Sequence, residues 1–109
     1  MNSERAGPRY YVTPTALRDL EDLWDFIAED NPTAASEVVQ TILAAADRLA
    51  EFPRIGHPRV DLADETLRVW PVHSYLIIYR PDQEPIEIIR IISGFRDLPA
   101  LLPDERNPR

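Results

Sequence analysis

Residues 67–97 read LRVWPVHSYLIIYRPDQEPIEIIRIISGFRD, and this stretch decides the fold. It contains three apolar runs rich in β-branched and aromatic residues, at 67–72, 75–79 and 86–92. His73 and Ser74 join the first two runs, and the polar segment 80–85, which holds two prolines, joins the second to the third. Short apolar runs separated by turn residues of this kind predict an antiparallel three-stranded meander. The rest of the chain should pack on it.

Two amphipathic helices are expected before the meander. In the first helix, apolar residues recur at helical spacing beneath an acidic outer face, and the stripe is Leu17, Leu20, Leu23, Trp24 and Ile27. Thr13 or Thr15 should cap this helix, and Pro32 should end it near Asn31, because the residue before a proline avoids the α region. Asn31 should then cap a second helix that runs to about Glu51. So short a connection predicts an antiparallel helix hairpin.

The predicted fold class is α+β, with the element order β-α-α-β-β-β. Residues 9–13 form a short β-type run and should be a strand at the sheet edge or beside the meander. The helix hairpin should cover one face of a small antiparallel sheet, and the other face should display polar residues or bind a partner. A single domain is expected over residues 1–109, with an ordered core at about 9–102 in which Leu98, Leu101 and Leu102 make a short terminal turn.

Composition narrows the possible functions. The net charge is −7, which opposes binding to phosphate, so no direct specific DNA binding is expected. No apolar run approaches the length of a membrane span, and the polar N-terminus has no signal-peptide pattern, so a cytoplasmic protein without membrane contact is expected. The chain has no cysteine, and two histidines alone cannot complete a zinc site, so neither a metal nor a cofactor is expected. No phosphate-binding glycine pattern or nucleophile motif occurs.

The arginines of the meander are the candidate functional residues. All 12 basic residues are arginines; Arg68 and Arg90 interrupt apolar strands, and Arg96 follows the last strand. An arginine in such a position must reach an open face or be paired. The three could converge into a basic spot on an acidic protein, or each could pair with an acid such as Glu87 or Asp97.

Taken in order, these features resemble the RelE/ParE superfamily of toxins from bacterial type II toxin–antitoxin modules. The resemblance covers roughly residues 10–102. The segments that carry it are ALRDL at 16–20, WDFI at 24–27, Phe52-Pro53 with Gly56, Leu67-Arg68, YLIIYR at 75–80 and IISGFRD at 91–97. Each motif is loose alone, but their order and spacing together are fairly specific.

Within the superfamily the sequence is more similar to ParE. That resemblance implies a toxin that inhibits DNA gyrase, and so replication, by protein contact without chemistry of its own. It also implies a cognate antitoxin whose C-terminal segment folds on the toxin surface. The antitoxin contacts implied are Leu17, Leu20 and Trp24. The target contacts implied are Arg68, Arg90, Arg96 and Asp97.

Two alternatives remain open on sequence alone. A RelE-like toxin would be a ribosome-dependent mRNA endoribonuclease, with Arg68 and Arg96 as phosphate or transition-state ligands. The chain has no lysine, however, and residues 97–102 supply neither the tyrosine nor the histidine that such toxins use for proton transfer. The other alternative is a toxin-fold protein without toxicity that acts as a binding module.

Overall fold

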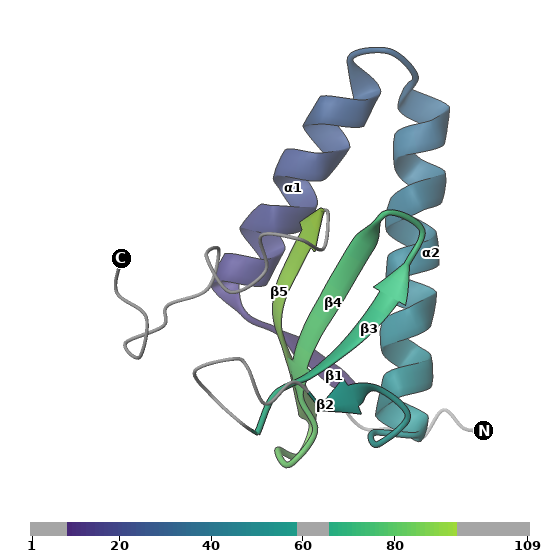
Figure 1. Cartoon of the computed structure of the whole chain (residues 1–109). Helices are drawn as coiled ribbons and strands as arrows, with labels where there is room; N and C mark the ends of the chain where they lie inside the picture. The colour runs from purple at the N-terminus through teal and green to yellow at the C-terminus, as the bar shows by residue number, and fades with distance from the viewer. Residues whose placement is uncertain (1–8, 59–65, 94–109) are drawn as a thin grey trace, which may run out of the picture.

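Two helices and five strands make up the part of the chain that the computed structural model describes, residues 9–58 and 66–93 (Figure 1). In chain order they are β1 (Tyr10–Val12), α1 (Pro14–Ala28), α2 (Pro32–Glu51), β2 (His57–Pro58), β3 (Arg68–Val72), β4 (Tyr75–Arg80) and β5 (Ile86–Ser93). The predicted terminal turn at Leu98, Leu101 and Leu102 lies outside the described residues.

The predicted helix boundaries are confirmed by the caps that the structure shows. The Oγ1 of Thr13 accepts a hydrogen bond from the backbone N–H of Ala16 at 3.2 Å, which satisfies one of the free donors at the start of α1. In the same way, Oδ1 of Asn31 accepts from the N–H of Ala34 at 3.0 Å at the start of α2. A proline occupies the first turn of each helix, where its missing N–H costs no hydrogen bond. The two helices form the expected antiparallel hairpin (Figure 1).

The sheet has the strand order β1-β5-β4-β3-β2. Strands β3, β4 and β5 form the predicted antiparallel meander. β1 pairs with β5 at the edge of the meander but runs parallel to it, with Tyr10 opposite Ile86 and Val12 opposite Ile88. The sheet is therefore mixed, whereas a wholly antiparallel sheet was predicted. The reason is that the chain reverses its direction after α1, between α2 and β3, after β3 and after β4, and this even number of reversals restores the direction of β1 (Figure 1).

A second difference concerns the connection after α2. The predicted order β-α-α-β-β-β has no strand between the second helix and the meander, yet His57 and Pro58 form the short strand β2, which pairs antiparallel with β3. An edge strand tolerates Pro58 because the missing N–H of a proline need not face a neighbouring strand there.

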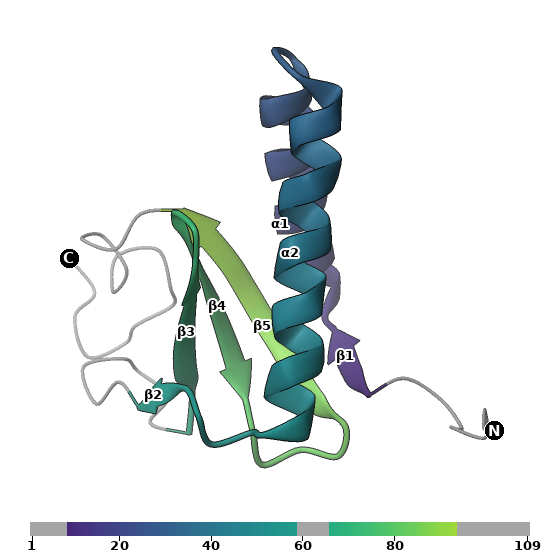
Figure 2. The ribbon, with the colours of Figure 1, turned by 90° about the vertical axis from the view of Figure 1, so that its right-hand side faces the viewer.

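Both helices lie on one side of the sheet (Figure 2). The main core fills the space between the helices and the sheet. Its buried members are Ala16, Leu20, Leu23, Ile42, Ala46, Leu49, Val72, Ile77, Tyr79, Ile86, Ile88 and Ile91. The opposite side of the sheet is apolar, not polar. There a second cluster of buried side chains comprises Leu67, Val69, Leu76, Ile78 and Ile92.

Candidate partner-binding site

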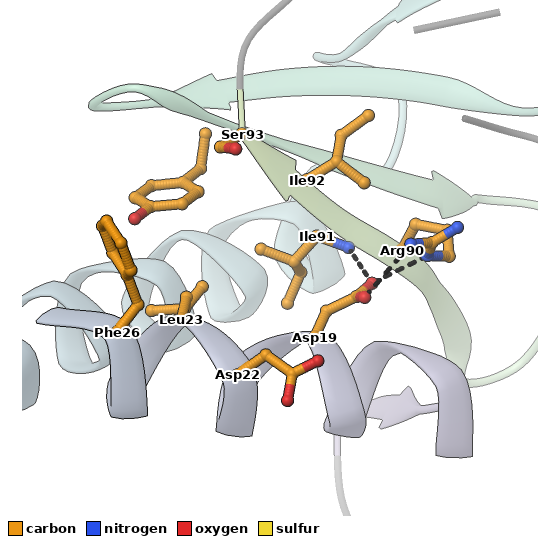
Figure 3. A pocket seen from close by; sticks show the side chains of 9 residues that line it. Asp19, Asp22, Leu23, Phe26, Arg90, Ile91, Ile92 and Ser93 are labelled. Atoms are coloured by element: carbon orange, nitrogen blue, oxygen red, sulfur yellow. Dashed lines mark hydrogen bonds and ion pairs between the residues drawn. The ribbon is translucent and has the colours of Figure 1, made fainter. Parts of the chain in front are cut away.

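A groove lies between α1 and the end of β5 (Figure 3). Its volume is about 440 Å³, and it is lined by Asp19, Asp22, Leu23, Phe26, Tyr75, Arg90, Ile91, Ile92 and Ser93. Leu23 and Ile91 are buried and belong to the core, whereas Phe26 is 73% exposed at the rim. A hollow with an apolar floor and an exposed aromatic ring is typical of a binding surface.

Asp19 fastens α1 to β5 at one end of this groove (Figure 3). Its Oδ2 accepts hydrogen bonds from Nε of Arg90 at 2.8 Å and from the backbone N–H of Ile91 at 2.9 Å. Its Oδ1 accepts a third bond from Nη2 of Arg90 at 3.1 Å. These bonds raise the pKa of the Arg90 guanidinium above its ordinary value. Such two-point, charge-assisted contacts are stronger than neutral hydrogen bonds and fix both partners in place.

The outer edge of β5 is only partly covered. β1 pairs with it as far as Ile88, and Thr13 extends the contact by donating its hydroxyl to the carbonyls of Ile88 at 3.0 Å and Ile89 at 3.2 Å. The N–H of Ile91 then points away from β4, toward Asp19. Because N–H and C=O groups alternate in direction along an antiparallel strand, the C=O of Ile91 and the N–H of Ser93 also point to this edge. The groove therefore borders a short stretch of strand edge that could accept another chain.

On the helix-facing side of the sheet, a second set of hydrogen bonds fastens the loop that follows α2. The hydroxyl of Tyr79 donates to the carbonyl of Pro53 at 2.7 Å and accepts from the N–H of Gly56 at 2.9 Å. Nη1 of Arg68 donates to the carbonyls of Gly56 at 2.6 Å and Arg54 at 3.2 Å. Burial raises the pKa of the Tyr79 hydroxyl. Arg68 therefore holds the loop in place and does not project freely from the sheet.

Arg68 and Arg90 do not converge into a basic spot. Arg68 lies on β3 opposite Tyr79, and Arg90 lies on β5 opposite Ile78, so β4 separates them by roughly 10 Å of sheet. Their side chains also leave the backbone on opposite faces of the sheet, because directly paired residues share a face. Tyr79, the partner of Arg68, belongs to the cluster under the helices, whereas Ile78, the partner of Arg90, belongs to the cluster on the other side. Arg96 and Asp97, the other predicted target contacts, lie outside the described residues.

The three predicted antitoxin contacts on α1 have different surroundings. Leu17 and Trp24 are exposed, at 49% and 36%, and Nε1 of Trp24 donates to Oγ of Ser36 on α2 at 3.4 Å. Leu20 is buried in the main core, which leaves it little surface for a partner. The exposed apolar surface of α1 thus consists of Leu17 and Trp24 together with Phe26.

Sequence reasoning did not find the role of Asp19. It was counted with the acidic outer face of α1, and Glu87 or Asp97 was suggested as a partner for an arginine of the meander. In the structure Asp19 bonds Arg90, while Glu87 accepts from Nη1 of Arg80 at 3.1 Å. One signal was present: Asp19 lies three residues after Ala16 and four before Leu23, both of which are buried, so it falls at the edge of the buried stripe.

Two further findings concern the candidate site's chemistry. Among residues 9–58 and 66–93, no group of three or more histidine, cysteine or acidic side chains is arranged to hold a metal ion. The ring of His57 stacks on the ring of Trp70, with ring centroids 6.4 Å apart. In the part of the chain that the structure describes, neither helix is long and apolar enough to cross a membrane.

Comparison with known proteins identifies the family. Residues 10–98 match the family model described as the ParE toxin of the type II toxin–antitoxin system parDE. Toxin ParE3 of Caulobacter vibrioides is 34% identical over 85 residues, which cover 77% of this chain and 84% of that protein. Toxin RelE2 of the same organism is 38% identical over 77 residues, which cover 70% of this chain and 83% of that protein.

The fold agrees with a solved structure described as the chromosomal ParDE toxin–antitoxin system from P. aeruginosa. The TM-score is 0.67 at 21% identity, and the match covers 79% of this chain and 95% of that one. The fold and the sequence together define a small toxin of the RelE/ParE type. The chain belongs to the ParE toxin family of type II toxin–antitoxin systems.

Proposed function

We propose that this toxin inhibits DNA gyrase by direct protein contact and that a cognate antitoxin neutralises it. The observation that carries the proposal is the match of the ParE family model to residues 10–98. The charge and the arginine contacts support it as well. A net charge of −7 opposes docking on phosphate-rich RNA, whereas it does not oppose a protein target.

Arg68 also favours a protein-inhibitor function over RNA cleavage. A phosphate or transition-state ligand needs donors that point to the place where negative charge develops. In Arg68, Nη1 already donates to two backbone carbonyls of the loop after α2, so part of its guanidinium is committed to holding that loop. This arrangement supports a structural function for Arg68.

The antitoxin is expected to bind along α1. The exposed side chains of Leu17, Trp24 and Phe26 supply apolar contact area, and the groove beside β5 supplies a hollow into which a side chain can fit. A segment that folds on binding can follow such a surface over a long distance. This docking would leave the Asp19–Arg90 pair intact, because both side chains are already bonded within the toxin.

The test is inducible expression in a bacterial host, followed by gyrase supercoiling and DNA-cleavage assays with the purified protein. Growth arrest with gyrase-cleaved DNA and intact mRNA is expected. Arg96→Ala should weaken gyrase inhibition, with Arg18→Ala as the matched control, because Arg18 is exposed on α1. Arrest with cleaved mRNA and normal supercoiling would refute the proposal, and so would the absence of arrest in a host whose gyrase the protein binds.

The second candidate function is ribosome-dependent mRNA cleavage. It is favoured by one observation, the 38% identity with toxin RelE2 over 77 residues. In that case Arg68 and Arg96 would contact the phosphate, and Arg68→Ala would abolish mRNA cleavage while supercoiling stayed normal. Arg68→Ala also removes the bonds to Gly56 and Arg54, so its thermal unfolding has to be compared with the parent protein before activity is interpreted.

A further inference from the structure

The side of the sheet that faces away from the helices carries the second cluster, whose buried members are Leu67, Val69, Leu76, Ile78 and Ile92. These side chains are between 0% and 6% exposed, and Ile78 is completely buried. Both helices lie on the other side, and the five described strands all belong to the one sheet, so no described helix or strand is stacked on this face (Figure 2). An uncovered sheet face leaves its side chains partly in contact with water, so burial this complete requires a covering segment.

The covering segment should come from the chain itself, because these residues are buried in a structure of one chain. Three segments lie outside the described residues, at 1–8, 59–65 and 94–109. The segment 94–109 holds four large apolar residues, against two in 59–65 and one in 1–8. The four are Phe95, Leu98, Leu101 and Leu102. Of the three segments, 94–109 therefore has the apolar side chains that best match a cluster of five.

The segment 94–109 also begins beside the second cluster. β5 ends at Ser93, directly after Ile92, which pairs with Leu76 on β4. The far side of the cluster lies on β3, two strand spacings or about 10 Å from β5. Five residues of extended chain span up to about 17 Å. A chain that leaves Ser93 can therefore lie over all three strands by the time it reaches Leu98.

We propose that residues 95–102 dock on the second cluster and complete a second hydrophobic core on this face of the sheet. Leu98, Leu101 and Leu102 recur at spacings of three and four, which places them on one side of a helical turn, whereas Ala100 falls on the opposite side. These three leucines pack over the centre of the cluster. Residues 103–109 are polar apart from two prolines and contribute nothing to this contact.

Covalent attachment selects this occupant over a second copy of the chain or a partner protein. A segment joined directly to β5 has an effective concentration on the order of 1 mM or more at the cluster. Another molecule contributes only its free concentration and would have to displace the attached segment first. The contact should therefore form within each molecule and should not depend on the protein concentration.

The docked segment also restricts two of the predicted target contacts. Arg96 and Asp97 stand between Ser93, the last residue of β5, and Leu98, the first of the three leucines. Docking of the leucines therefore holds the chain on both sides of Arg96 and keeps this residue close to the end of β5. The inference goes beyond the proposed function and does not depend on which protein is the target.

The first experiment is nuclear magnetic resonance spectroscopy of the full chain with labelled methyl groups. Nuclear Overhauser contacts are expected between the methyl groups of Leu101 or Leu102 and those of Leu76 or Ile78. The absence of such contacts would overturn the proposal, and so would contacts from Leu62 in their place. A sample mixed from labelled and unlabelled protein separates contacts within a molecule from contacts between molecules. Contacts found only between molecules would assign the face to a second copy and would also overturn the proposal.

Thermal unfolding of matched variants provides the second experiment. Leu101→Asp should lower the Tm by at least about 8 °C, because it removes a buried apolar side chain and places a charge against the cluster. Ala100→Asp introduces the same charge on the opposite side of the turn, so it should lower the Tm by less than about 3 °C. Equal shifts for the two variants would overturn the proposal.

A milder variant covers the case in which Leu101→Asp does not fold. Leu101→Ala should lower the Tm by at least about 4 °C, and an unchanged Tm for this variant would overturn the proposal. Neither experiment involves gyrase or an antitoxin. Growth arrest with gyrase inhibition by a protein that lacks the methyl contacts would therefore overturn this inference and leave the proposed function standing.

Discussion

Gly56→Ala should destabilise this protein more than a substitution in a surface loop usually does. A methyl group built at Gly56 would meet the phenol of Tyr79, with Cε1 at 2.7 Å and Cζ at 2.9 Å and the hydroxyl closer still. Atoms do not approach this closely, so either the ring or the loop has to move. The ring has little room, because Tyr79 is fully buried in the core beneath the helices.

The magnitude follows from the contacts that such a movement disturbs. Overfilling a packed site costs about 1–3 kcal/mol. Shifting the ring also weakens the two hydrogen bonds of the Tyr79 hydroxyl, to Pro53 and from Gly56, each of which contributes about 1 kcal/mol. The free energy of unfolding should therefore fall by about 2–4 kcal/mol. Tyr79→Phe, which leaves the same loop N–H and C=O without a partner, should cost about 1–3 kcal/mol.

A double-mutant cycle in urea or guanidinium tests the mechanism. In the Tyr79→Phe background the closest atom to the new methyl group is gone, so Gly56→Ala should cost about 1–2 kcal/mol less than it does in the parent protein. Contacts with the ring carbons persist, so the cost should not vanish. The reasoning is refuted if Gly56→Ala costs less than about 0.5 kcal/mol, or if the two changes are simply additive.

Three further substitutions or conditions test other parts of the structure. Asp19→Asn should lower the free energy of unfolding by about 2–3 kcal/mol, since it removes the carboxylate charge that strengthens both hydrogen bonds from Arg90. Asp22→Asn at the exposed rim should change the free energy of unfolding by less than about 0.5 kcal/mol, and equal effects in denaturant titrations would contradict this. His73→Gly should raise the free energy of unfolding by about 0.5–1 kcal/mol and shift the denaturant midpoint upward. The reason is that His73 has a φ of 54° at the first position of a two-residue hairpin turn, where glycine is preferred. A lower free energy of unfolding would show that the imidazole itself holds the turn. Alkaline pH should destabilise the fold, because burial raises the pKa of Tyr79 and of Tyr10 above the ordinary value of 10.0. The tyrosines of the unfolded chain lose their protons first, so the free energy of unfolding falls as the pH rises through and beyond that value. Tyr79→Phe should flatten this decline in unfolding titrations from about pH 8 to about pH 11.

The fold was predictable wherever local signals determined it. Thr13 and Asn31 cap their helices, and His73 and Ser74 make the turn between β3 and β4, because each of these features depends on a few neighbouring residues. The direction of β1 in the sheet was not predictable in this way. It depends on the number of chain reversals between residues 12 and 86, which is a property of the whole topology.

The candidate site was less accessible to sequence reasoning. The hydrophobic pattern gave Leu17, Leu20 and Trp24 the same apparent status, although only the packing of the helix on the sheet shows that Leu20 is buried while Leu17 is exposed. The pairing of Asp19 with Arg90 joins residues 71 positions apart, and no local pattern specifies such a pair. The groove itself exists because α1 lies beside an edge of β5 that β1 covers only as far as Ile88.

The neighbouring position of β1 and β5 also constrains when the protein can act. Thr13, which caps α1, bonds a carbonyl 75 positions later in the chain, and the main core takes side chains from β4 and β5. During synthesis the helix hairpin is therefore made first, and its apolar face stays uncovered until β5 has left the ribosome. Pairing across so long a separation is also slow relative to helix formation. A nascent chain that lacks β5 has neither a closed core nor the groove beside β5, so each toxin molecule should become active only after β5 has been synthesised.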